Sequence, residues 1–229
     1  MSPSSFRFGS GKMDNKSNGS YPKHATLARQ LAAVGRDFYE RGWMLGTSGN
    51  LSAVAGAKPL RLAITPSGAD KGALTSSQIL QIDEHGAVTR GNGRPSDETR
   101  LHLTVVRERG AGAVLHTHSV WSTLLSETFA REGRLPIEGF EMLKGLTGVQ
   151  THEHREDLPV IENSQDMEAV SRSFAKALDQ YPAAHGVLLR RHGLYTWGRN
   201  LDEARRHVEI FEFLLEVVGR TQFARNAES

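Results

Sequence analysis

In the stretch Ala113-Val114-Leu115-His116-Thr117-His118-Ser119, an apolar run ends in two histidines spaced i, i+2. On a β-strand this spacing places both imidazoles on the same face. The small apolar residues before them predict a buried strand that runs out to the edge of a sheet. Two histidines held in this way are half of a zinc site.

A third histidine stands in a similar setting far downstream. Residues 186–193 read Gly-Val-Leu-Leu-Arg-Arg-His-Gly, which predicts another apolar strand ending in His192. Three neutral imidazoles with one open position are the ligand set of a catalytic zinc. The chain has no cysteine, so a metal has to be held by His, Asp or Glu, and no disulfide can form. An isolated His-x-His pair would indicate only ordinary histidines at the surface or the edge of the core.

Apolar periodicity predicts a mixture of helices and strands along the whole chain. Helices are expected over 25–42, 96–109 with Ser96 as the cap, 120–129, 167–180 and 202–219. Strands are expected around 51 and over 60–65, 79–83, 87–89, 113–118, 159–162, 186–192 and 194–197. Strands in neighbouring runs with helices around them favour a mixed α/β fold, in which a mainly antiparallel sheet is flanked by helices on both faces.

Length and composition limit the class of protein. With 229 residues the chain can bury a full core, and we expect a disordered tail over 1–22 followed by one catalytic domain over 23–229. The net charge of +2 gives little support to nucleic-acid binding. No stretch approaches the roughly 20 apolar residues that span a bilayer, and the start has no apolar signal segment. The lack of cysteine is consistent with a reducing compartment such as the cytoplasm.

Three polar loops rich in small residues are the second signal. They are Gly-Thr-Ser-Gly-Asn at 46–50, Thr-Pro-Ser-Gly at 65–68 and Arg-Pro-Ser-Asp-Glu at 94–98. Such loops bring backbone N–H groups close to an anion, and a predicted helix start at Ser96 adds a favourable dipole. Each loop alone would indicate a plain turn, but together, upstream of a histidine metal motif, they predict a phosphate site.

These motifs together resemble the class II aldolase family of zinc enzymes that act on sugar phosphates. Gly-Thr-Ser-Gly-Asn-Leu-Ser (46–52), Ile-Thr-Pro-Ser-Gly (64–68), Pro-Ser-Asp-Glu (95–98), His-Thr-His-Ser (116–119) and Arg-Arg-His-Gly (190–193) occur in the family's order. The resemblance covers residues 25–220. Within the family, Glu-Met-Leu-Lys-Gly at 141–145 and the segment 191–198 look like those of the methylthioribulose-1-phosphate dehydratases of methionine salvage.

The resemblance implies roles for particular residues. One zinc per subunit would be held by His116, His118 and His192. The phosphate would be bound by residues of the three loops, namely Thr47, Asn50, Ser67, Gly68 and Ser96. The family's aldolases use as base the acid that corresponds to Glu98, whereas the dehydratases use the glutamate that corresponds to Glu141. Both are present, and we expect Glu141 to be the acid/base and Glu98 a second acid/base or a fourth zinc ligand.

The implied reaction is the dehydration of 5-methylthioribulose 1-phosphate to 2,3-diketo-5-methylthiopentyl 1-phosphate, in a cytoplasmic homo-oligomer that the resemblance makes a tetramer. Two alternatives stay open: a class II aldolase or epimerase acting on fuculose, rhamnulose or ribulose phosphate, and a non-catalytic metal-binding member of the same fold. We expect His152 and His154 to lie in a surface loop outside the site. Lys71 and Lys144 are either phosphate contacts or solvated lysines, and His102 is a partner of Glu98 or an ordinary helix-face histidine.

Overall fold

The structure is a computed structural model that describes residues 21–227. All but the last two residues of the predicted tail lie outside this range, and the division into a tail and one domain stays a prediction. None of the helices in the described range is long and apolar enough to cross a membrane.

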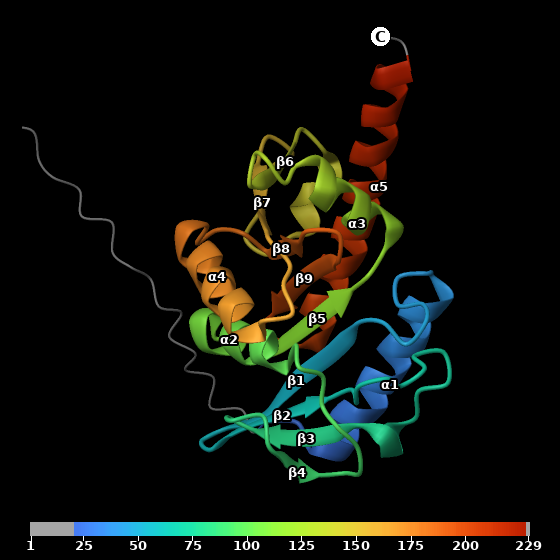
Figure 1. The fold of residues 1–229 in the computed structure, drawn as a ribbon, viewed down its shortest axis with the longest axis vertical. Coiled ribbons are helices and arrows are strands. Elements are labelled where there is room, and N and C mark those ends of the chain that lie inside the picture. Colours follow the sequence, from blue (N-terminus) through green and yellow to red (C-terminus); the bar gives the residue numbers. More distant parts are fainter. Residues whose placement is uncertain (1–20, 228–229) are drawn as a thin grey trace, which may run out of the picture.

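Five α-helices and nine strands make up the described part of the chain (Figure 1). The helices are α1 (His24–Glu40), α2 (Thr99–Arg109), α3 (Val120–Thr128), α4 (Met167–Gln180) and α5 (Leu201–Ala227), with short 3-10 helices η1 (Ser76–Gln78) and η2 (Glu141–Gly145). The strands are β1 (Asn50–Ala57), β2 (Leu60–Ile64), β3 (Leu80–Asp83), β4 (Val88–Arg90), β5 (Ala113–Thr117), β6 (Arg134–Glu138), β7 (Arg155–Ile161), β8 (Gly186–Leu189) and β9 (Gly193–Gly198).

The nine strands form one sheet in the order β4-β3-β2-β1-β5-β9-β8-β7-β6. Neighbouring strands are antiparallel except β7 and β8, which are parallel. The strand of the His-x-His motif, β5, lies at the centre between β1 and β9. A central strand is buried on both faces, which explains why Ala113, Val114 and Leu115 are all apolar and fully buried.

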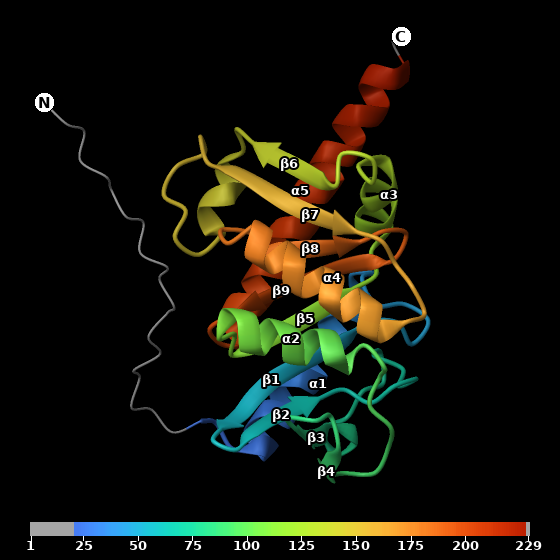
Figure 2. The ribbon, with the colours of Figure 1, turned by 60° about the vertical axis from the view of Figure 1, so that its left-hand side comes forward.

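Helices cover both faces of the sheet, as predicted. Ala113 and Leu115 pack in one cluster with residues of α1 and the start of α5, while Val114 packs in another with residues of α2 and α4. This division follows from the alternation of side chains along β5. Figure 2 shows α2 and α4 in front of the sheet and α1 behind it. His116 alternates with Leu115 and therefore belongs to the face that carries α2.

Several predicted boundaries were wrong. The helix expected from Ser96 begins at Thr99, because the Ser96 hydroxyl accepts a hydrogen bond from the N–H of Glu98 (3.3 Å) and leaves residues 96–98 in a turn. The strand before His192 ends at Leu189, so His192 lies in a turn. Strand β6 was missed, since it contains Pro136; it is the last strand in the sheet order, where a proline is tolerated.

Candidate metal centre and phosphate pocket

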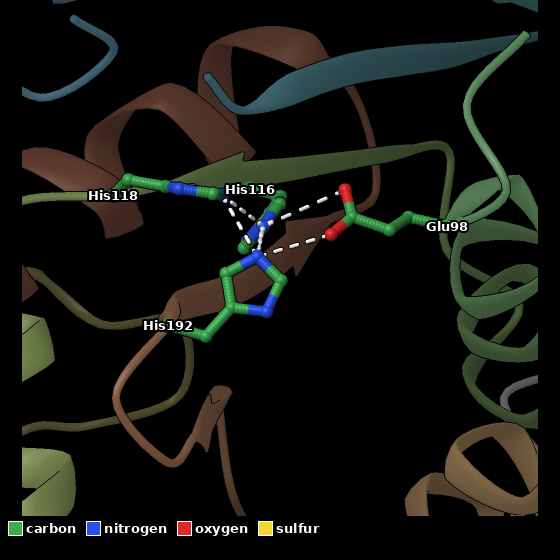
Figure 3. A group of neighbouring side chains, drawn as sticks. All are labelled: Glu98, His116, His118 and His192. Carbon is green, nitrogen blue, oxygen red and sulfur yellow. Dashed lines mark hydrogen bonds and ion pairs between the residues drawn. The ribbon is translucent and has the colours of Figure 1, made fainter. Parts of the chain in front are cut away.

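Three histidines meet at the ends of the central strands (Figure 3). His116 belongs to β5, His118 follows this strand, and His192 comes from the turn between β8 and β9. The Nε2 atom of His116 lies 2.7 Å from that of His118 and 3.3 Å from that of His192. The Nε2 atoms of His118 and His192 are 3.0 Å apart. The pairing of β5 with β9 brings the two distant segments together.

The protonation states of His116 and His118 leave nitrogen lone pairs that can bind a cation. The Nδ1–H of His116 donates to the carbonyl of Leu194 (2.9 Å), which leaves a lone pair on Nε2. Burial lowers the pKa of His116 well below its ordinary value and lowers the pKa of His118 to about 4. Nitrogen atoms that carry no proton cannot form hydrogen bonds with one another, even when they lie this close. The donor set therefore fits a metal ion bound between the three Nε2 atoms.

Glu98 completes the group from the opposite side. Its Oε1 lies 3.0 Å from Nε2 of His192 and its Oε2 lies 3.8 Å from Nε2 of His116. Burial raises the pKa of Glu98, but its interactions with His116, His192 and Asn50 outweigh burial and hold this pKa below its ordinary value. The ligand atoms of Glu98 and the three histidines all lie within 4.8 Å of one another, so this group could hold a metal ion.

Unusual backbone positions flank the group. In the described residues, Thr47 (φ +68°) and Arg191 (φ +54°) are the non-glycine residues with positive φ, a conformation that costs free energy and concentrates at functional sites. Arg191 immediately precedes His192. A Cβ on Gly193 would lie 2.0 Å from the carbonyl oxygen of Thr117, so only glycine lets the His192 turn approach the His-x-His strand this closely.

A buried hydrogen-bond relay supports Glu98 from behind. The Asn50 amide donates to Oε2 of Glu98, so its carbonyl faces Nε2 of His102 and accepts from it. Nδ1 of His102 then accepts from the hydroxyl of Ser52 at 2.7 Å. His102 is fully buried, and burial lowers its pKa to about 4, which keeps it neutral. Of the two possibilities for His102, the structure therefore supports the first: His102 contacts Glu98 through Asn50.

We predict that His102→Leu lowers kcat by about 10- to 100-fold, the usual effect of losing a group that orients a site residue. Without its donor, Asn50 is free to turn its amide and Glu98 loses a fixed orientation. Arg100→Leu, an exposed change on the same helix, is the control and should leave kcat unchanged. Equal kcat values for the two variants would show that the relay has no functional role.

Glu212 of α5 lies behind the His-x-His strand. Its Oε1 accepts from the hydroxyl of Thr117 (2.8 Å), and its Oε2 is buried and has no hydrogen-bond partner among the described residues. Burial raises the pKa of Glu212 to about 7, although the neighbouring hydroxyls of Ser119 and Thr117 act against this shift. The carboxyl is thus a buried group that prefers its neutral form.

Glu212 should make folding stability depend on pH. Because its folded pKa exceeds its unfolded pKa, its contribution is complete below the unfolded value and is lost as pH rises through the folded one. Between pH 5 and pH 8 this loss amounts to at most about 3 kcal/mol of the free energy of unfolding. Glu212→Gln should show a correspondingly smaller loss in urea unfolding at the two pH values. Other titrating groups are common to both proteins, so identical pH dependences would contradict this assignment.

The predicted phosphate residues surround a pocket of about 280 Å³ beside the histidines. Thr47, Asn50, Ser67, Gly68 and Ser96 all line it, together with Glu98, His118 and His192. Sequence reasoning missed one wall, formed by Asn163, Ser164, Gln165 and Met167. This segment follows β7, which runs parallel to β8, so its position could have been inferred from the rule that parallel strands end at the same edge.

Other residues considered in the sequence lie elsewhere. Glu141 is on η2 with its side chain 72% exposed, paired with Lys144 (2.7 Å) and near His152 (3.8 Å), and it does not line the pocket. His152 is exposed, as expected, but His154 is half-buried and lies 3.0 Å from the buried carboxylate of Glu156. Lys71 is buried and is not a solvated lysine.

Comparisons with known proteins agree with this architecture. Residues 29–218 match the family described as Class II Aldolase and Adducin N-terminal domain. The chain is 42% identical over 195 residues to methylthioribulose-1-phosphate dehydratase of Marinobacter nauticus, covering 85% of this chain and 93% of the relative. It is 40% identical to the protein of the same name from Sorangium cellulosum, over 86% of this chain and 93% of the relative.

A solved structure gives the same result at the level of the fold. The L-fuculose-1-phosphate aldolase of Thermus thermophilus superposes with a TM-score of 0.71 at 25% identity, over 89% of this chain and 98% of the aldolase. The family match spans both the histidine strands and the phosphate loops. The chain belongs to the family of class II aldolase and adducin N-terminal domains.

Proposed function

We propose that this protein is a zinc-dependent dehydratase that converts 5-methylthioribulose 1-phosphate to 2,3-diketo-5-methylthiopentyl 1-phosphate in methionine salvage. The observation that carries the proposal is the convergence of three histidines and the Glu98 carboxylate beside the loop-lined pocket, whose wall includes Glu98, His118 and His192. The names of the 40–42% identical relatives support the choice of substrate. We further propose a cytoplasmic homotetramer.

In this proposal, different residues bind the metal and the phosphate. His116, His118 and His192 would hold one zinc, and Glu98 would be its fourth ligand in the resting enzyme. When bound, zinc supplies a Lewis acid that stabilises negative charge developing on the substrate oxygens. Thr47, Asn50, Ser67, Gly68 and Ser96 bind the phosphate and so place the carbon chain over the histidines.

The acid/base steps need a carboxylate at the substrate. It removes the proton from C3, next to the C2 carbonyl, and then protonates the departing C4 hydroxyl, so that water leaves and the enol becomes the diketone. We assign these steps to Glu141. A hydrogen bond from Lys144 lowers the pKa of Glu141 and keeps it in the basic form. Since Glu141 lies outside the pocket of its own chain, a second copy has to bring it there.

A direct test uses two substrates. The purified protein is incubated with methylthioribulose 1-phosphate and, separately, with fuculose 1-phosphate, and the products are identified by NMR. We expect the diketone from the first and no cleavage of the second. The aldolase alternative has one specific observation in its favour, the position of Glu98 beside His116 and His192. Dihydroxyacetone phosphate without any diketone would establish that alternative.

A further inference from the structure

Lys71 is a buried ammonium group next to the pocket. Only 1% of the residue is exposed, and Nζ donates to the carbonyl oxygens of Thr47 (3.0 Å) and Ala69 (2.9 Å). It makes no ion pair within 4.0 Å in the described part of the chain. Burial lowers its pKa to about 8, which leaves it mostly charged at neutral pH. A buried charge held by carbonyls alone is costly, so an anion bound in the neighbouring pocket would stabilise it.

The lining of the pocket carries no permanent positive charge in the described residues. It contains the acids Asp97 and Glu98, and no lysine or arginine among the residues that the structure describes. A phosphate ester carries up to about two negative charges at neutral pH. Backbone N–H groups and hydroxyls alone would have to hold this charge beside two carboxylates. Lys71 is a buried positive charge near the pocket, and it interacts electrostatically with Glu98 and His118.

Lys71 also joins the two glycine-containing loops. Thr47 belongs to the loop 46–50, and Ala69 directly follows Gly68 of the loop 65–68. The two carbonyls turn toward Nζ, and Thr47 does so in its positive-φ conformation. With these carbonyls turned to Lys71, an approaching anion does not meet their negative ends.

We propose that Lys71 is the buried cation of the phosphate site. It acts from behind the loops, without touching the substrate: its ammonium group ties Thr47 to Ala69 and supplies the positive charge that holds a phosphate monoester or free phosphate in the pocket. The inference rests on the proposed function in that it takes this pocket to be a phosphate site.

The test measures binding of inorganic phosphate to the zinc-loaded protein by calorimetry. Lys71→Met removes both the charge and the hydrogen bonds, whereas Lys71→Gln keeps two N–H donors without the charge. Both should bind phosphate at least about tenfold more weakly than the wild type. With the sugar phosphate, both should raise KM more than they lower kcat. Lys176→Met, which removes an exposed lysine of α4, is the control and should bind as the wild type does.

Every outcome of this test either supports or overturns the role assigned to Lys71. Wild-type phosphate affinity in Lys71→Gln would show that the charge has no role and would overturn the proposal. Failure of both variants to fold, judged by circular dichroism and zinc content, would assign Lys71 to the fold alone and overturn it as well. Lys71-dependent phosphate binding by a protein that dehydrates no methylthioribulose 1-phosphate would refute the proposed function and leave the assignment of Lys71 intact.

Discussion

Alanine at His116, His118 or His192 is expected to remove most of the bound zinc and to abolish turnover. Each substitution deletes one of three nitrogen ligands, and the chain has no thiolate that could replace it. The loss should be seen as zinc per subunit after dialysis, together with kcat. Zinc content of the wild type should be one per subunit.

The matched controls are His152→Ala and His154→Ala, which change a second His-x-His pair outside the centre. Both should retain zinc. His154→Ala removes a partner of the buried Glu156, so it is expected to lose some stability without losing metal. Zinc loss in these variants, with zinc retained in the first three, would mean that the metal centre is assigned to the wrong histidines.

Glu141→Gln is expected to lower kcat by roughly 10²–10⁴-fold, the usual contribution of a general acid/base, with normal zinc content. The amide keeps the size of the side chain but cannot accept the C3 proton. Glu98→Gln should lose less turnover and some zinc, because its carboxylate lies 3.0 Å from Nε2 of His192 and in the proposed function is a ligand of the resting metal. The reverse order, with Glu98→Gln inactive and Glu141→Gln unaffected, would show that this chain uses the aldolase-type base.

Mixing subunits tests where Glu141 acts. Glu141→Gln and His118→Ala should each be nearly inactive alone. If a second copy supplies Glu141, subunit exchange creates sites with three intact histidines and an intact Glu141, and part of the activity returns. No recovery in verified mixed oligomers would place the action of Glu141 within its own chain or outside the reaction. Mixing His116→Ala with His118→Ala is the control, since every site then lacks one histidine.

The amino-acid sequence by itself determined most of the elements, though not β6, and the residue types of the site. The period of two expected of a strand predicted that His116 at the end of β5 and His118 just after it share one face, and apolar periodicity located α1, α3 and α4 within a residue or two. These properties depend on neighbours along the chain, so local pattern is enough to predict them. The three loops were predicted to bind one phosphate because their composition suits an anion, and all of them line one pocket.

The tertiary structure alone decided which distant residues touch. No local pattern shows that Asn50 turns its amide between Glu98 and His102, 48 and 52 residues away, or that Lys71 is buried beneath the phosphate loops. The same holds for the Asn163–Met167 wall and for the absence of Glu141 from its own chain's pocket. These contacts follow from the pairing of β1, β5 and β9 and from the packing of α2 on that face, which are set by burial over the whole chain and not by the conformational preference of any one segment.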